Sequence, residues 1–242
     1  GEGQALDTRR YRLLSVDWLG GAHASSPARG ARVSSADQAR ALLLLVNRLG
    51  ARRVHLLVGA SYGGAVAQHL AALLGGRLRH LALFCTAHRS SAFARAFRHV
   101  QRAILELGGD SQPALALARQ LAILGYVTHA EIESRFGDSA EVLPWLARHG
   151  ARFAERFNAY AYRCLGEALD SHRIDPAVIR VPTTLFGATE DQLVPPSLAH
   201  EFAALVPDCR LVEISSRHGH DAFLKEEAAV AEVLRAALGE GG

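Results

Sequence analysis

A glycine- and serine-containing turn constrains the fold of this chain more than any other stretch. Residues 54–58 form a short apolar run that predicts a buried strand, and residues 65–74 carry apolar side chains at helical spacing. Between them, residues 59–64 read Gly-Ala-Ser-Tyr-Gly-Gly, which contains the pattern Gly-x-Ser-x-Gly. A strand, a tight turn and a helix form the context in which this pattern makes a nucleophile elbow. We therefore expect Ser61 to adopt a strained backbone conformation, with its Oγ exposed above a sheet.

Small residues are required in such a turn because the strand and the helix must approach each other closely. The pattern predicts that Gly59 and Gly63 provide this space. The backbone N–H of Tyr62 opens the helix, where it can donate to a forming oxyanion. The alternative interpretation is a glycine-rich turn between strand and helix with an incidental serine.

The rest of the chain predicts an α/β fold, with a mostly parallel sheet and helices on both faces. Strands are expected at residues 11–17, 80–85, 181–187 and 210–214, and helices at residues 35–49, 197–205 and 222–238, the first capped by Ser34 or Ser35. Residues 92–107, 112–125, 128–136, 139–149 and 151–170 show helical spacing without strand signals. We therefore expect a core of residues 1–86 and 172–242, with an inserted all-helical lid at 87–171. In such a fold, function is expected at the carboxyl ends of the strands.

Composition argues against several classes of function. The 242 residues carry a net charge of +3, and the basic residues are spread along the chain, which does not favour nucleic-acid binding. No apolar run reaches the ~18 residues that a membrane-spanning helix needs. The cysteines, Cys85, Cys164 and Cys209, are odd in number and far apart, which favours neither a disulfide framework nor a zinc site. We expect a cytoplasmic protein with no metal and no membrane association.

An acid and a base follow the serine in the chain order that elbow enzymes use, which is serine, then aspartate or glutamate, then histidine. Asp191 comes just after the strand expected to end at residue 187, and His220 comes just after the strand expected to end at residue 214. Glu190 and His218 are the nearest alternatives for the two roles. The order predicts a triad of Ser61, Asp191 and His220.

These motifs together resemble a known family of acyltransferases. The segments are residues 59–64, residues 190–195 (Glu-Asp-Gln-Leu-Val-Pro) and residues 219–224 (Gly-His-Asp-Ala-Phe-Leu). They are similar to those of the homoserine O-acetyltransferase/O-succinyltransferase family, and further matches at residues 5–11, 17–21, 156–158 and 168–170 extend the resemblance over nearly the whole chain. The resemblance implies an α/β-hydrolase fold. It also implies transfer of an acetyl or succinyl group from acyl-CoA to the side-chain hydroxyl of L-homoserine or L-serine, in methionine and amino-acid biosynthesis.

The resemblance also implies roles for individual residues in a ping-pong mechanism. Ser61 would be the nucleophile that forms an acyl-serine, Asp191 the orienting acid and His220 the base. The N–H of Tyr62 would be one oxyanion donor. No cofactor would stay bound, because acetyl-CoA or succinyl-CoA is a co-substrate.

The acceptor site implied by the resemblance lies partly in the lid. Arg119 and Tyr126, seven residues apart, and Asp221 match the positions that bind the amino-acid acceptor. A guanidinium suits the α-carboxylate, and a carboxylate suits the α-ammonium. The alternative for Arg119 is a surface ion pair. A homodimer built through the lid helices is a further expectation by analogy.

The chain departs from the family at its start. The family's first strands and the loop that completes the oxyanion hole precede the match, so we expect a sheet without these N-terminal strands. The chain also begins without methionine, which indicates processing or a fragment. Residues 21–27 are a loose version of the family's glycine- and serine-rich loop. Two alternatives therefore stay open, an esterase or thioesterase of the same fold and a non-catalytic homologue or assembly partner.

Overall fold

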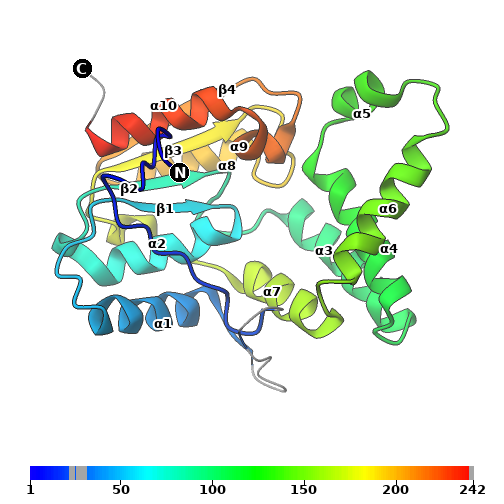
Figure 1. The fold of residues 1–242 in the computed structure, drawn as a ribbon, viewed down its shortest axis with the longest axis horizontal. Helices are drawn as coiled ribbons and strands as arrows, with labels where there is room; N and C mark the ends of the chain where they lie inside the picture. The colour runs from blue at the N-terminus through cyan, green and yellow to red at the C-terminus, as the bar shows by residue number, and fades with distance from the viewer. Residues whose placement is uncertain (22–24, 26–31, 240–242) are drawn as a thin grey trace.

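Four parallel strands form the sheet at the centre of the molecule (Figure 1). The computed structural model describes residues 1–21, 25 and 32–239. The strands are β1 (Leu57–Ala60), β2 (Leu81–Phe84), β3 (Thr183–Ala188) and β4 (Cys209–Ile214), adjacent in that order. Their register brings residues 60, 84 and 186 side by side, so the carboxyl ends of the first three strands meet at one edge. This arrangement confirms the expected α/β fold with a parallel sheet.

Helices cover both faces of the sheet. The long helices of this part are α1 (Ser35–Arg48), α2 (Tyr62–Leu74), α8 (Pro196–Leu205) and α10 (Glu227–Leu238), with a single turn, α9 (Ala222–Lys225), before the last. One core cluster joins the sheet to α1, α2 and α8 and includes Leu70 and Phe202. A second cluster joins the sheet to α10 and includes Phe186 and Val233. Both faces of the central strands β2 and β3 are therefore buried, as their near-continuous apolar runs require, whereas the outer strands β1 and β4 are partly exposed.

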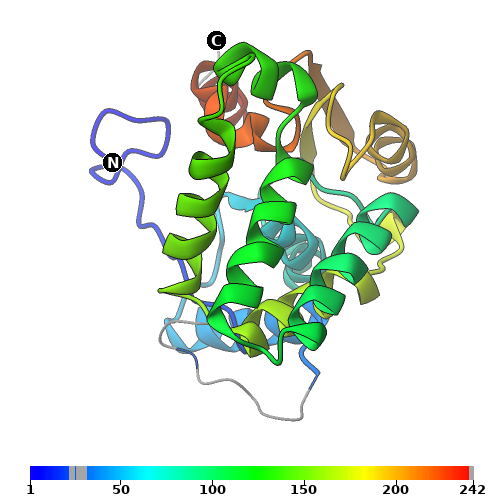
Figure 2. The ribbon, with the colours of Figure 1, turned by 90° about the vertical axis from the view of Figure 1, so that its right-hand side faces the viewer.

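Five further helices lie beside the carboxyl ends of the strands (Figures 1 and 2). They are α3 (Ala92–Leu107), α4 (Gln112–Tyr126), α5 (His129–Phe136), α6 (Val142–Ala154) and α7 (Ala159–Ser171). Helix α4 packs between α3 and α6 around a core that includes Leu105 and Leu115. All five fall within residues 87–171, and the division of the chain into core and lid at these positions stays a prediction.

Several expected boundaries were wrong. Residues 11–17 form no strand, and Leu13 and Leu14 are about half exposed, because alternation alone makes no strand without a partner for its backbone groups. The expected strand at 54–58 begins only at residue 57, since Val54 makes an isolated bridge to Leu78.

Two helix boundaries also differ from the expected ones. The expected break at Gly150 lies inside α6, because this residue faces α4: a Cβ there would stand 2.4 Å from the carbonyl oxygen of Ala116. The single helix expected over residues 222–238 is interrupted at Glu226, which leaves helical geometry with φ −89° and ψ 59°.

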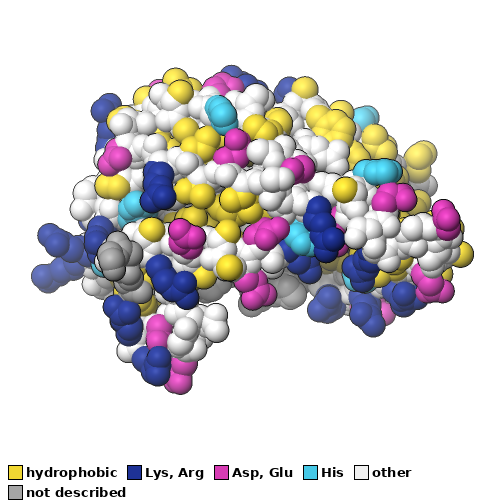
Figure 3. All heavy atoms as spheres, turned by 90° about the horizontal axis from the view of Figure 1, so that it is seen from above, with side chains coloured by type: hydrophobic (Ala, Val, Ile, Leu, Met, Phe, Trp, Pro, Cys, Tyr) yellow, Lys and Arg dark blue, Asp and Glu magenta, His cyan; other side chains and the backbone are white. Residues whose placement is uncertain are grey.

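Two expectations concern loops and surfaces. Most of the small-residue loop at residues 21–27 lies outside the described residues. Among the described helices, none is long and apolar enough to cross a membrane. The face in Figure 3 shows acidic and basic side chains interspersed, in keeping with their spread along the sequence.

Helix α2 approaches the sheet closely at two glycines, and one of them is not the expected residue. A Cβ on Gly59 would lie 2.5 Å from the carbonyl oxygen of Gly63, and a Cβ on Gly64 would lie 2.4 Å from Cγ2 of Thr86. A Cβ on Gly63 would meet only Trp18, at an ordinary 3.7 Å. The approach of α2 to β1 therefore requires Gly59, and its approach to the segment after β2 requires Gly64. Gly63 contributes its backbone oxygen to the first contact.

We expect Gly64→Ala to destabilise the protein and Gly63→Ala not to. The added methyl group at Gly64 overlaps the buried Thr86, which should lower the free energy of unfolding by about 1–3 kcal/mol. At Gly63, alanine fits and favours the helix by up to about 1 kcal/mol. Urea unfolding followed by circular dichroism measures both. Equal stability of the two variants would contradict this account of the crossing.

Candidate active site

Ser61 occupies the turn from β1 to α2 in a backbone conformation that side chains rarely adopt. Its φ is 49° and its ψ is −117°. The backbone N–H of Ser61 donates to the carbonyl oxygen of Phe84 at 2.9 Å, which anchors the turn to the neighbouring strand. Because this residue directly precedes the helix, its side chain projects from the edge where the strands end. This is the strained geometry expected of an elbow.

A chain of hydrogen bonds runs from Ser61 to a buried carboxylate. The Oγ of Ser61 lies 2.8 Å from Nε2 of His220, and Nδ1 of His220 lies 2.7 Å from Oδ2 of Asp191. The side chain of His220 is 5% exposed and that of Asp191 is fully buried. Three residues that are 29 to 159 positions apart in sequence thus meet at one point.

The surroundings of Asp191 determine which imidazole nitrogen carries the proton. Its Oδ1 accepts the backbone N–H groups of Leu193 and Val194, both at 2.9 Å. A carboxylate can only accept hydrogen bonds, so the hydrogen between Oδ2 of Asp191 and Nδ1 of His220 belongs to the imidazole. We therefore assign the proton to Nδ1 of His220, which leaves Nε2 free to accept the hydroxyl proton of Ser61.

The two alternative residues take other partners. The carboxylate of Glu190 accepts the backbone N–H of Ser216 and the hydroxyl of Ser215, both at 2.7 Å. It therefore connects the loop that carries the acid to the loop that carries the base, and it does not contact the imidazole of His220. His218 lies near the carboxylate of Glu131, with its Nδ1 at 3.5 Å from Oε2.

Helix α5 is bonded to the loop that carries His220. Thr128, the residue that caps this helix, donates its hydroxyl to the carbonyl oxygen of Arg217. The guanidinium of Arg217 forms an ion pair with Glu131, at 3.0 Å between Nε and Oε2. Both contacts lie within three residues of the imidazole that faces Ser61.

The backbone N–H of Tyr62 lies at the first position of α2. The first N–H groups of a helix have no acceptor within the helix, and they carry its positive end. This N–H follows directly on Ser61, as an oxyanion donor must. The ring of Tyr62 packs edge-on against Trp18, with centroids 5.2 Å apart, and burial raises the pKa of its phenol to about 12.

Arg119 and Tyr126 both lie on α4, and Asp221 directly follows His220 in the short turn Gly219–Asp221. Nη1 of Arg119 donates to the phenol oxygen of Tyr126 at 3.3 Å, and the guanidinium stacks on the rings of Tyr126 and Phe153 at 5.1 and 4.7 Å. The ring of Tyr126 lies 6.0 Å from that of His220. Arg119 therefore takes aromatic and phenolic partners, and among the described residues it does not form the surface ion pair considered as its alternative.

The carboxyl of Asp221 is partly withdrawn from solvent. Desolvation by burial raises its pKa, and the nearby charges of His220 and Arg119 counteract part of that shift. Of the three residues, Tyr126 lines the cavity at Ser61, whereas Arg119 and Asp221 lie outside its lining.

A cavity of about 280 Å³ opens at Ser61 and His220. Its lining is mostly apolar and aromatic, with Trp18 on the core side and Phe97, Phe153 and Phe157 on the lid side. Polar side chains border it at Ser90, Arg98, Gln101 and Tyr162. Sequence reasoning assigned none of these residues to the site. For Arg98, Gln101 and Tyr162, the helical spacing of α3 and α7 identifies an apolar face but not which polar side chain turns into a cavity.

A second serine–histidine pair borders the same cavity at His172. Its Nδ1 lies 2.9 Å from Oγ of the buried Ser35, and its Nε2 lies 3.2 Å from the carbonyl oxygen of Ala87. Burial lowers the pKa of His172 to about 4, so the imidazole is neutral at neutral pH. The carbonyl oxygen requires a proton on Nε2, and Ser35 then donates to Nδ1. This pair joins α1 to the end of α7.

Comparisons with known proteins agree with this geometry. The chain matches the α/β hydrolase fold family over residues 1–227. It is 38% identical to a homoserine O-succinyltransferase of Xanthomonas campestris pv. campestris, over 98% of this chain and 67% of that protein. It is 32% identical to a homoserine O-acetyltransferase of Thermus thermophilus, over 98% of this chain and 70% of that protein.

The chain belongs to the homoserine O-acetyltransferase/O-succinyltransferase family. A solved homoserine O-acetyltransferase from Staphylococcus aureus superposes with a TM-score of 0.87 at 25% identity, over 98% of this chain and 76% of that one. Esterase E22 superposes with a TM-score of 0.86 at 20% identity, over 98% of this chain and 80% of that one, which shows a shared fold. Within the described part of the chain, no group of three His, Cys, Asp or Glu side chains is arranged to hold a metal ion.

We expect Asp191→Asn to slow the reaction of Ser61 with a fluorophosphonate by about 10³–10⁴-fold. The amide would present an N–H₂ group toward the backbone donors or toward Nδ1, and so would favour the wrong imidazole tautomer. Labelling followed by intact mass gives the rate without requiring a substrate.

Glu190→Gln is the matched control, because Glu190 is the neighbouring carboxylate and contacts Ser215 and Ser216 instead of His220. It should change the labelling rate by less than about tenfold. A larger loss in Glu190→Gln than in Asp191→Asn would reverse the assignment of the acid.

Proposed function

We propose that this protein transfers an acyl group from acyl-CoA to the side-chain hydroxyl of L-homoserine, or of L-serine, through an acyl-serine. The observation that carries the proposal is the hydrogen-bond chain from Ser61 through His220 to Asp191 at the wall of a cavity. Membership of the family, with relatives named for both homoserine acylations, supports the acceptor. The acyl group is acetyl or succinyl.

In the first half-reaction, Oγ of Ser61 attacks the thioester carbonyl while Nε2 of His220 takes the hydroxyl proton. The negative charge that forms on the carbonyl oxygen is stabilised by the N–H of Tyr62 at the positive end of α2. Asp191 stabilises the imidazolium through Nδ1. Collapse of the intermediate breaks the carbon–sulfur bond, and the proton on Nε2 leaves with coenzyme A.

In the second half-reaction, the acceptor hydroxyl attacks the acyl-serine. His220 now takes the proton of that hydroxyl, and collapse returns it to Oγ of Ser61 and releases the O-acyl amino acid. We assign the acceptor's α-carboxylate to Arg119 and Tyr126, and its α-ammonium to Asp221. The raised pKa of Asp221 implies that acceptor affinity falls on acidification at a higher pH than an ordinary aspartate would produce.

The aromatic lining of the cavity supports transfer over hydrolysis. A bound hydroxyl gains a large effective concentration over water when it is held in line with the acyl carbon. Phe153 and Tyr126 stack on the Arg119 guanidinium, which keeps a long side chain in one orientation. A hydrolase of neutral esters would make no use of this arrangement.

We further propose a cytoplasmic enzyme that forms a homodimer through the lid helices. Phe93 and Val100 on α3 and Leu117 on α4 are each about half exposed, which suits an apolar contact between copies. No sequence feature favours a nucleic-acid partner.

Arg119→Ala should separate the two half-reactions. Intact mass after mixing with acetyl-CoA or succinyl-CoA should show one added acyl group in both the native protein and the variant. A chase with L-homoserine should remove it quickly from the native protein and about 10²-fold more slowly from the variant, because a charge-assisted contact to the carboxylate is lost.

Arg135→Ala is the matched control, since Arg135 is also a lid arginine stacked on two aromatic rings, those of Phe136 and Trp145. It should leave both half-reactions unchanged. Equal loss of acylation and deacylation in Arg119→Ala would contradict the assignment of Arg119 to the acceptor's carboxylate. Rapid loss of the acyl group in water alone would indicate an esterase, and no labelling of Ser61 would indicate a non-catalytic homologue.

A further inference from the structure

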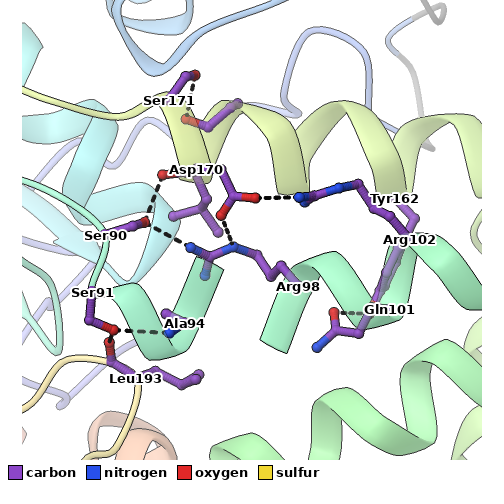
Figure 4. A network of polar contacts seen from close by, with 12 residues as sticks. Ser90, Ser91, Ala94, Arg98, Gln101, Arg102, Tyr162, Asp170, Ser171 and Leu193 are labelled. Atoms are coloured by element: carbon purple, nitrogen blue, oxygen red, sulfur yellow. Dashed lines mark hydrogen bonds and ion pairs between the residues drawn. The ribbon is translucent and has the colours of Figure 1, made fainter. Parts of the chain in front are cut away.

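Two arginines of α3 bracket one carboxylate of α7 (Figure 4). Nε of Arg98 lies 2.7 Å from Oδ1 of Asp170, and Nη2 of Arg102 lies 2.6 Å from Oδ2 of the same group. The three side chains are only 14% to 19% exposed. Together they carry a net charge of +1 in a mostly buried place, where an unbalanced charge is costly.

Arg98 is held in a fixed orientation by a second contact. Its Nη2 donates to Oγ of Ser90 at 2.8 Å, and the Ser90 hydroxyl donates to the carbonyl oxygen of Leu169 at 2.8 Å. Figure 4 shows the guanidinium lying between Ser90 and Asp170. Among the described residues, Nη1 of Arg98 has no hydrogen-bond partner. The guanidinium can therefore donate from this nitrogen to another group.

This side of the cluster borders the cavity that holds the nucleophile. Arg98, Ser90 and Gln101 line it together with Ser61 and His220, whereas Arg102 and Asp170 do not. The amide oxygen of Gln101 accepts the phenol of Tyr162 at 2.8 Å, which leaves its amide N–H₂ as a second donor. Arg98 and Gln101 thus present a cation and an amide donor to a largely apolar cavity. The other arginine of the lining, Arg89, forms an ion pair with Glu201 at 2.6 Å.

We propose that Arg98 binds the free carboxylate of a dicarboxylic acyl group, of the succinyl class, while Ser61 carries that group as an ester. The inference rests on the proposed acyl transfer and selects among its donors. One carboxylate balances the net charge of +1, and a guanidinium fork suits its geometry. An acetyl group leaves Arg98 without an anion.

Two other anions fit less well. The diphosphate of coenzyme A is separated from the acyl carbon by a long pantetheine arm, and it carries more charge than the cluster can balance. The acceptor's α-carboxylate has Arg119 available, beside Tyr126 and His220. Arg98 is thereby assigned to the acyl group.

The experiment compares succinyl-CoA with butyryl-CoA, whose acyl group has the same number of carbons but no charge. The native protein should have the higher kcat/KM for succinyl-CoA. In Arg98→Gln the ratio of the two values should fall by about 10²-fold, and Arg98→Lys should recover part of it. Arg135→Gln is the matched control, because Arg135 is also a lid arginine but belongs neither to this cluster nor to the cavity lining, and its ratio should stay within about threefold of the native one.

Three results would overturn the inference. The first is an equal loss with both donors in Arg98→Gln, which would mark a structural role. The second is an unchanged donor ratio with a raised KM for L-homoserine, which would place the acceptor at Arg98. The third is a native protein that prefers butyryl-CoA or does not discriminate. None of these outcomes contradicts the proposed acyl transfer.

A second measurement separates this inference from the proposed function. The p-nitrophenyl esters of butyric acid and of succinic acid (as the hemiester) acylate an activated serine without coenzyme A, and intact mass reports the product. Faster acylation by the hemisuccinate in the native protein but not in Arg98→Gln supports the carboxylate site even if no acyl-CoA reacts. Equal rates for the two esters in both proteins contradict it.

Discussion

The rest of the site depends on the close crossing of β1 and α2. At this crossing a Cβ on Gly59 would overlap the backbone oxygen of Gly63, and the chain between these two residues turns through Ser61 at a φ of 49°. The turn places the hydroxyl outside the sheet and the N–H of the next residue at the positive end of a helix. A nucleophile and an anion-stabilising donor therefore arise from one backbone conformation. Its strain is balanced by the buried packing of α2 against the sheet.

The chain divides positioning between two sets of elements. Loops that follow β3 and β4 carry Asp191 and His220, and Glu190 accepts hydrogen bonds from the second loop and so joins it to the first. The helices α3, α4 and α7 supply the side chains that border the cavity, including Arg98 and Tyr126. In our proposal the core performs the bond-breaking chemistry and the lid selects what reaches it. The same core can therefore serve different acyl groups when only lid residues change.

The sequence allowed the elbow and its partners to be located because each lies within a few residues of a strand end. Asp191 and His220 follow apolar runs in a fixed chain order, and the structure brings both within hydrogen-bonding reach of Ser61 or of each other. The choice of Gly63 instead of Gly64 was wrong because a motif does not report which Cβ direction faces Thr86.

Other features could not be predicted from local patterns. Residues 11–17 alternate like a strand, yet a strand exists only through its partner. Gly150 resembles a helix stop, but its missing side chain lets α6 approach the backbone of α4. The helical spacing around Arg98 is typical of a solvated helix residue. Only the structure shows that Asp170, 72 positions later in the chain, lies beside it. No motif relates these two positions, so the sequence gives no signal for their contact.

The bonds from α5 to the loop of His220 have a consequence for motion. Thr128 and Glu131 both attach to Arg217, three residues before the imidazole. If α5 swings away from the core, it must either break these contacts or carry the loop with it. Where the contacts hold, opening of the lid displaces the base at the same time. In our proposal the acyl-serine would then meet bulk water without an aligned base, so its hydrolysis would be slowed by this coupling as well as by burial.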